Sequence, residues 1–178
     1  MITKTINLYS YDELSEKVKE KVLNDYRSNN NYDFLEEDIT EYLKELLTIN
    51  KIGFDESLKV GYSLSNCQGD GFNFTGEVVY KNMVIKLKQF DSHYQHSNTV
   101  SFEYLKFNHI YAEELTDKQT EKANKLLIEF ENLFKSICRD CEKYGYNFIE
   151  SEDSKDNIRD NLNANEYTFR ENGTIEHI

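Results

Sequence analysis

The sequence predicts an α+β fold: an antiparallel sheet of four to five strands packed against two N-terminal helices and one long C-terminal helix, plus a small C-terminal helix and hairpin. Alternating apolar residues between positions 60 and 80 indicate a β-hairpin at the centre of the sheet. Apolar stripes at helical spacing lie on both sides of this hairpin. Because 178 residues with 38% hydrophobic side chains can bury one core, we expect residues 1–178 to form a single domain.

The first helix is expected to follow a short strand at residues 4–9. Ser10 and Glu13 have the spacing of a capping box, which marks a helix start. Apolar residues then recur every four positions, at Leu14, Val18, Val22 and Tyr26. This spacing is typical of a helix with one buried stripe, and the asparagines at positions 29–31 are expected to end it.

A second helix is expected to begin near Asp33 and to stop at Gly53. Its predicted buried stripe consists of Leu35, Ile39, Tyr42, Leu43, Leu46 and Leu47. The opposite face carries Glu37, Glu41 and Glu45, about 6 Å apart along the axis, with Asp38 beside them. Residues 31–57 hold eight acidic and two basic side chains, so this face is predicted to be an acidic ridge.

The sheet is expected to form between residues 60 and 107. Its central hairpin is predicted to turn at Gly69-Asp70-Gly71, where both glycines can adopt positive φ. Two further strands, at 83–90 and 99–107, are rich in β-branched and aromatic residues. The polar residues 91–98 between them predict a turn at the end of the sheet.

The C-terminal third begins with Thr116 and Gln119, which have capping-box spacing and open the longest predicted helix. Gly145 is expected to end that helix. A short helix at 151–162 and a hairpin at 167–175 follow. In the hairpin, a three-residue loop is expected to place Gly173 in the left-handed region, with Phe169 opposite Ile175.

The net charge of −12 resides mainly in the predicted helices. Residues 58–109 carry four acidic and five basic side chains, whereas residues 110–178 carry sixteen and nine. Acidic surfaces of this kind repel nucleic acid and attract basic protein surfaces, especially those that hold phosphates. We therefore expect a basic host protein or ribonucleoprotein as partner, in particular a nuclease, and no direct binding to nucleic acid.

The sequence also bears on the compartment. No run approaches the ~18 apolar residues of a membrane span, and the first residues lack the apolar core of a signal peptide. Three cysteines are an odd number in a chain of this size, which is typical of a reducing compartment. We expect a cytoplasmic protein without membrane contact, located in the host cell if a phage encodes it.

The segment Gln68-Gly69-Asp70-Gly71 could cradle a phosphate on its backbone N–H groups. However, no lysine follows it, and Asp70 places a carboxylate where the phosphate would lie. The preferred interpretation is a structural turn or a contact surface. Gln68 and Asp70 are therefore candidate partner-binding residues, together with Glu37, Asp38, Glu41 and Glu45.

The cysteine and histidine pairs are candidate chemical sites. Cys138 and Cys141 have the spacing of a zinc or redox pair, but both lie on an apolar helix stripe and are expected in the core. His93 and His96 could form a metal site or a nucleophile pair with Cys67 if a turn brought them together. Neither pair supplies four convergent ligands, so we expect no metal and no cofactor.

Three segments together resemble a family of phage and mobile-element proteins that are often labelled "antitoxin of toxin–antitoxin stability system". These are Tyr-Asp-Glu-Leu-Ser at 11–15, Gln-Gly-Asp-Gly at 68–71 and Ala-Asn-Glu-Tyr-Thr-Phe at 164–169. The chain departs from the family pattern at Asn66, Cys67 and Phe72, where the family tends to have an aromatic residue, a serine and a small residue. The resemblance implies a phage accessory protein, and such proteins often counter host defence.

Charge and resemblance together predict a non-enzymatic, anti-CRISPR-like inhibitor of phage type. It would bind a host nucleic-acid-processing complex, such as a CRISPR effector nuclease, through its acidic helices. Two alternatives stay open. One is an antitoxin that neutralises a basic toxin, and the other is a small hydrolase that uses Cys67 and His93 or His96 with Asp70.

Overall fold

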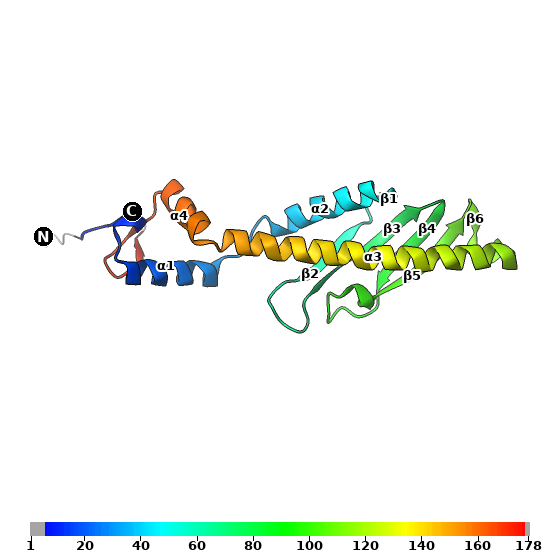
Figure 1. Cartoon of the computed structure of the whole chain (residues 1–178), viewed down its shortest axis with the longest axis horizontal. Coiled ribbons are helices and arrows are strands. Elements are labelled where there is room, and N and C mark those ends of the chain that lie inside the picture. The colour runs from blue at the N-terminus through cyan, green and yellow to red at the C-terminus, as the bar shows by residue number, and fades with distance from the viewer. Residues whose placement is uncertain (1–5, 177–178) are drawn as a thin grey trace, which may run out of the picture. The chain divides into compact units, whose positions relative to one another are not determined.

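The computed structural model describes residues 6–176, which divide into two compact units (Figure 1). Unit 1 comprises Met1–Asp33 and Asn147–Ile178, and unit 2 comprises Phe34–Tyr146. Each unit has its own cluster of buried apolar side chains. The expectation of one core is therefore wrong, while the prediction that residues 1–178 act as a single domain stays a prediction.

Unit 2 contains the expected antiparallel sheet, which confirms the α+β class. The strands are β1 (Ile52–Phe54), β2 (Lys59–Ser63), β3 (Gly71–Tyr80), β4 (Met83–Gln89), β5 (Val100–Phe107) and β6 (Ile110–Tyr111). Their order is β1-β3-β4-β5-β6, and β2 pairs with the first half of β3. The buried face of these strands is rich in aromatic and β-branched residues, among them Phe72, Phe74, Val78, Tyr80, Ile85 and Val100.

The central hairpin has the predicted pairing but a different connection. Tyr62 lies opposite Phe72, and Val60 lies opposite Phe74. The chain between β2 and β3 is a loop over residues 64–70, and its left-handed residue is Asn66, with φ 57°. The prediction of positive φ at the two loop glycines is therefore wrong.

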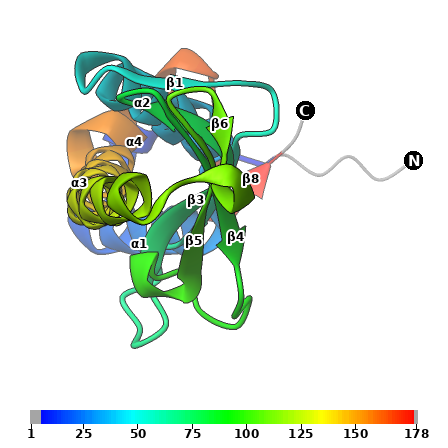
Figure 2. The same ribbon diagram turned by 90° about the vertical axis from the view of Figure 1, so that its right-hand side faces the viewer.

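Helices α2 (Leu35–Ile49) and α3 (Asp117–Glu152) complete unit 2, with α3 belonging to it as far as Tyr146. Figure 2 looks along α3 and shows it lying against the sheet. The helices bury Ile39, Leu43, Leu47, Phe130, Phe134 and Cys138 against Phe74, Val78 and Ile85 of the sheet. Removing this apolar surface from water is the main stabilising contribution to unit 2.

Two glycines that were expected to stop helices do not do so. After α2, Lys51 adopts the left-handed conformation, with φ 57°, and Gly53 lies within β1. Gly145 lies inside α3, where a Cβ atom would collide with Leu64 and would lie 3.1 Å from the Cδ1 atom of Ile39. Its function is therefore to let α3 approach its neighbours closely.

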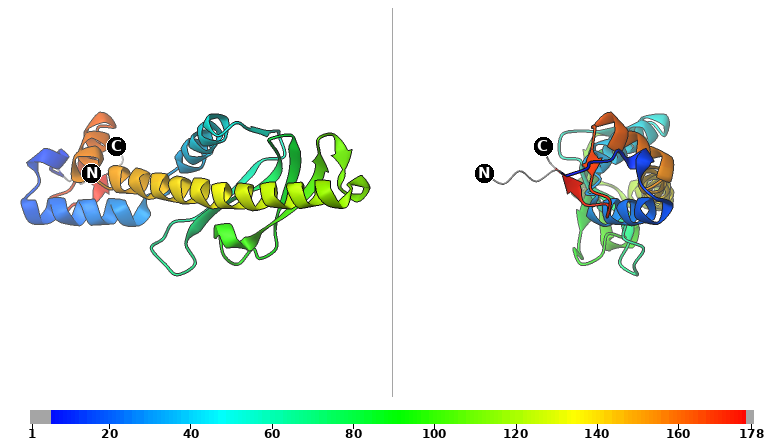
Figure 3. Two further views of the ribbon diagram at one scale, coloured as in Figure 1. Left: turned by 45° about the vertical axis from the view of Figure 1, so that its right-hand side comes forward. Right: turned by 90° about the vertical axis from the view of Figure 1, so that its left-hand side faces the viewer.

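Unit 1 contains a short 3-10 helix η1 (Tyr11–Glu13), α1 (Glu16–Asn29), α4 (Lys155–Ala164) and a hairpin of β7 (Thr168–Phe169) and β8 (Ile175–Glu176) (Figure 3). Its core consists of Tyr11, Leu14, Val22, Leu23, Ile158, Leu162 and Phe169. The buried residues of α1 belong to this core. Of the two N-terminal helices, α2 therefore contributes to the core of the sheet and α1 to the core of unit 1.

The predicted turn chemistry of unit 1 is largely confirmed. The Ser10 backbone N–H donates to Glu13 over 2.8 Å, although this capping box opens η1 and α1 begins only at Glu16. Gly173 has φ 85°, and Phe169 lies opposite Ile175. Of the strand expected at residues 4–9, residues 6–8 form no strand and Tyr9 makes a single bridge with Phe169. Residues 4 and 5 lie outside the described residues.

Candidate functional site

The acidic face of α2 consists of Glu37, Glu41 and Glu45, all of which are exposed. The helix turns this face to solvent because Leu35, Ile39, Leu43 and Leu47 on its other side are buried. Asp38, which was predicted to belong to the same site, is half-buried. The structure therefore presents the three glutamates together and places Asp38 at their edge.

This face carries little compensating charge. Lys44 is the single basic residue of α2 and pairs with Glu41 over 2.6 Å. Within residues 6–176, Glu37 and Glu45 have no salt-bridge partner. A carboxylate is favoured only in the first turn of a helix, so Glu41 and Glu45 gain nothing from the helix dipole.

Large apolar side chains flank the acidic face. Phe34, directly before α2, is 70% exposed, and Ile49 at its end is 74% exposed. A shallow hollow of about 340 Å³, lined partly by Glu41, Glu45 and Ile49, lies at the same end. Apolar anchors beside charged groups are typical of protein-binding surfaces.

Asp70 is buried and holds the loop between β2 and β3 together. Its carboxylate accepts hydrogen bonds from the hydroxyls of Ser63 and Ser65 over 3.0 and 3.1 Å. The backbone N–H and the thiol of Cys67 also donate to it, over 3.0 and 3.1 Å. The fifth donor is the hydroxyl of Tyr146 in α3, at 2.5 Å. We call these five residues the Asp70 network.

The network determines the charge state of its carboxyl group. Burial by itself would raise the pKa of Asp70, but the hydrogen bonds from Tyr146, Cys67 and Ser63 outweigh burial and lower this pKa below its ordinary value. Burial and the bond to Asp70 raise the pKa of Tyr146 to about 12. At neutral pH the site is therefore a charged carboxylate that accepts five hydrogen bonds.

The remaining loop residues lie around this network. Gln68 is exposed, as a partner-binding residue must be. Gly71 lies tightly against the loop before β5, because a Cβ atom on it would lie 2.7 Å from the carbonyl oxygen of Gln95 and 2.8 Å from Nδ1 of His96. The structure therefore separates the predicted contact residues of this loop into an exposed Gln68 and an internally bonded Asp70.

The alternative nucleophile pair is not assembled within the described residues. The Cys67 thiol donates to Asp70 and lies 3.6 Å from the Ser65 hydroxyl, and no hydrogen bond joins it to His93 or His96. The two histidine rings contact the ring of Tyr94, at centroid distances of 4.7 and 5.7 Å. Nucleophilic activation needs a base within hydrogen-bond reach of the thiol.

Cys138 and Cys141 both lie in the core of unit 2, as expected. Burial raises the pKa of the Cys141 thiol to about 12 and that of Cys138 well above its ordinary value. No group of three or more His, Cys, Asp or Glu side chains in the described part of the chain is arranged to hold a metal ion.

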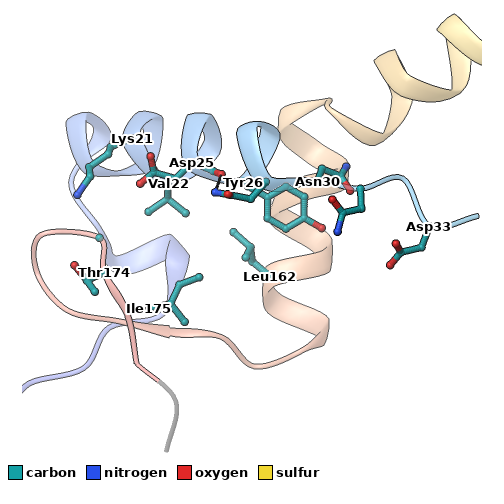
Figure 4. A pocket seen from close by; sticks show the side chains of 12 residues that line it. Lys21, Val22, Asp25, Tyr26, Asn30, Asp33, Leu162, Thr174 and Ile175 are labelled. Atoms are coloured by element: carbon teal, nitrogen blue, oxygen red, sulfur yellow. Dashed lines mark hydrogen bonds between the residues drawn. The ribbon is translucent and has the colours of Figure 1, made fainter. Parts of the chain in front are cut away.

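Unit 1 contains a cavity of about 550 Å³ that the sequence did not indicate. Figure 4 shows Val22 and Tyr26 of α1 directed toward Leu162 of α4 and Ile175 of β8. The buried Nδ2 atom of Asn30, another lining residue, has no hydrogen-bond partner. The volume falls in the range of small-molecule sites, and the lining suits an apolar group that carries a hydrogen-bond acceptor.

Sequence reasoning missed Tyr146, because the helix was expected to end just before it. The buried stripe of α3, continued past Gly145, could have indicated the longer helix.

Comparison of the chain with protein-family models, curated proteins and solved structures gave no match. Across residues 6–176, no helix has both the length and the apolar character needed to cross a membrane.

Proposed function

We propose that this chain is a non-enzymatic inhibitor of phage type that binds a basic, nucleic-acid-processing protein of the host cytoplasm. The observation that carries the proposal is the acidic face of α2, where Glu37, Glu41 and Glu45 are exposed and share a single lysine. These carboxylates form a row of negative charge about 12 Å long. Such a row can occupy a groove whose lysines and arginines normally hold phosphates.

The positions of the glutamates favour a binding function over a structural one. Glu41 and Glu45 lie beyond the first turn, where the helix dipole no longer stabilises negative charge. Phe34 and Ile49 expose apolar surface at the two ends of the same helix. Charge for steering and apolar anchors for affinity are the two contributions that a protein interface requires.

The resemblance to phage accessory proteins makes a guide-loaded CRISPR effector nuclease the first partner to test. The inhibitor would bind in the basic channel that receives guide or target nucleic acid, and it would therefore compete with that nucleic acid. In the alternative, the chain is an antitoxin, and the same acidic surface binds a basic toxin in place of the nuclease.

The test compares the parent protein with a Glu37→Gln, Glu41→Gln, Glu45→Gln triple variant against a panel of guide-loaded effector nucleases. Inhibition of target cleavage and binding are measured at low and high salt. We expect the variant to bind about tenfold more weakly or worse, because three interfacial charges are lost. Binding by the parent should also weaken as salt rises.

The matched control removes the same charge elsewhere, through Glu113→Gln, Glu114→Gln and Glu171→Gln, which are all exposed. This variant should bind like the parent, and both variants should keep the parent's melting temperature. Equal inhibition by the α2 variant and the parent at both salt concentrations would show that α2 presents only a solvated face.

A further inference from the structure

A second site lies in unit 2, in a groove of about 530 Å³ between the start of β3, the short helix η2 (Ser97–Thr99) and α3. Figure 3 shows the loops at this end of the sheet beside α3. The lining residues are Gly71, Phe72, His96, Ser97, Asn98, Asn132, Lys135, Cys138, Arg139 and Glu142. None of them belongs to the acidic face of α2.

One wall of the groove is cationic. Lys135 and Arg139 are four residues apart on α3, so their side chains emerge about 6 Å apart on the same side of the helix. Seven basic side chains of residues 6–176 form salt bridges, but Lys135 and Arg139 do not. Other basic side chains of residues 6–176 also lack a salt bridge, but Lys135 and Arg139 line the same groove, so an anion bound there would meet two cations that no carboxylate already holds.

Further hydrogen-bonding groups line the same groove. The ring of His96 stacks on that of Tyr94, with ring centroids 5.7 Å apart and an interplanar angle of 23°. Ser97 and Asn98 of η2 add a hydroxyl and an amide to the lining, and Asn132 adds a second amide from α3. All of these groups can donate to phosphate oxygens. Glu142 is the single carboxylate in the lining.

The size of the groove argues for more than an inorganic ion. A water molecule occupies ~30 Å³ in the liquid, so a groove of about 530 Å³ has room for a ligand much larger than a few water molecules. Phe72 and Cys138, which are 1% and 2% exposed, lie at the base of the groove beside the cations, so an organic group would contact only the edges of these side chains. A ligand with an anionic group and an organic body would match both parts of the lining.

We propose that this groove binds a small molecule that carries a phosphate group. Lys135 and Arg139 hold the phosphate from α3, and the polar groups of the η2 loop complete its hydrogen bonds. The organic body lies toward Phe72 and Cys138. Charge-assisted hydrogen bonds of this kind are about twice as strong as neutral ones, so the two cations should dominate the affinity.

The first experiment uses adenosine 5′-monophosphate as the probe, with adenosine and inorganic phosphate as its parts, and measures binding by calorimetry on the whole chain. We expect saturable binding of the nucleotide, weaker binding of phosphate in competition with it, and none of adenosine. Equal binding of adenosine and the nucleotide would overturn the proposal. Tighter binding of a single-stranded oligonucleotide than of the nucleotide would do so too.

The second experiment uses three variants. Lys135→Gln with Arg139→Gln should weaken nucleotide binding by about tenfold or more, whereas Lys118→Gln with Lys122→Gln, on the exposed start of α3, should leave it unchanged. Glu142→Gln should strengthen binding, because it removes the single carboxylate of the lining. A gain of affinity cannot come from misfolding. Equal affinity in all three variants would place the ligand elsewhere.

Discussion

Replacing Tyr146 by Phe removes one hydroxyl from the Asp70 network and leaves the ring in place. The hydroxyl donates to a buried, ionised carboxylate over 2.5 Å. A hydrogen bond to a charged group contributes about 1.5–3 kcal/mol to stability, and Phe fills the same ring volume, so no cavity term adds to it. We expect the free energy of unfolding at pH 7 to fall by about 1.5–3 kcal/mol.

The matched control is Tyr144→Phe, two residues earlier in α3. The ring of Tyr144 stacks on that of Tyr42, with centroids 4.3 Å apart, and its hydroxyl makes no hydrogen bond among the described residues. Its removal should change stability by less than about 0.5 kcal/mol. Urea unfolding, followed by tyrosine fluorescence and circular dichroism, measures both variants against the parent.

The pH dependence gives a second readout. The pKa of Asp70 is lowered by folding, so its stabilisation is present above the unfolded value of ~3.9 and is lost as pH falls below it. The pKa of Tyr146 is raised from 10.0 to about 12, so its contribution is present below pH 10 and is lost as pH rises through 12. The difference between parent and Tyr146→Phe should therefore be constant near neutrality and shrink at both extremes. Equal stability losses in the two Phe variants would refute a carboxylate-centred network.

Two further predictions concern the same end of the sheet and the core. Gly71→Ala should lower the free energy of unfolding by about 1–3 kcal/mol, because the new Cβ atom would press on the backbone of Gln95. Gly69→Ala should be tolerated, since the atom nearest to its new Cβ would be in the ring of Tyr94, at 3.4 Å. Equal melting temperatures of the two variants would contradict this prediction. Of the three cysteines, only the exposed Cys67 should react with a thiol reagent in the folded protein. Burial raises the pKa of Cys138 and Cys141 and excludes the reagent from both thiols. Rapid labelling of more than one thiol without denaturant would show that the core opens.

Periodicity predicted the elements of the fold well. The buried stripes of α2 and α3, the pairing of Tyr62 with Phe72 and the left-handed Gly173 all follow from local spacing. Periodicity identifies which face of a helix is buried but not its partner. The separate core around α1 was therefore invisible in the sequence.

The glycines show a second limit. A glycine can serve a positive φ or a close approach, and the sequence does not distinguish the two uses. Gly71 and Gly145 serve close approaches, which depend on residues far away in the chain. The same limit applies to Asp70, which was predicted as a contact residue. One of its hydrogen-bond donors, Tyr146, comes from a helix far away in the sequence, so local spacing did not indicate this internal bond.

The division of the chain also has a consequence for synthesis on the ribosome. Unit 2 is continuous in sequence, from Phe34 to Tyr146, so all of its strands and most of α3 are available before the last segment is translated. Unit 1 needs both ends of the chain, because Val22 and Leu23 of α1 are buried together with Leu162 and Phe169. Domains generally fold as units during translation. The apolar stripe of α1 therefore stays without its partners until Leu162 and Phe169 have been translated.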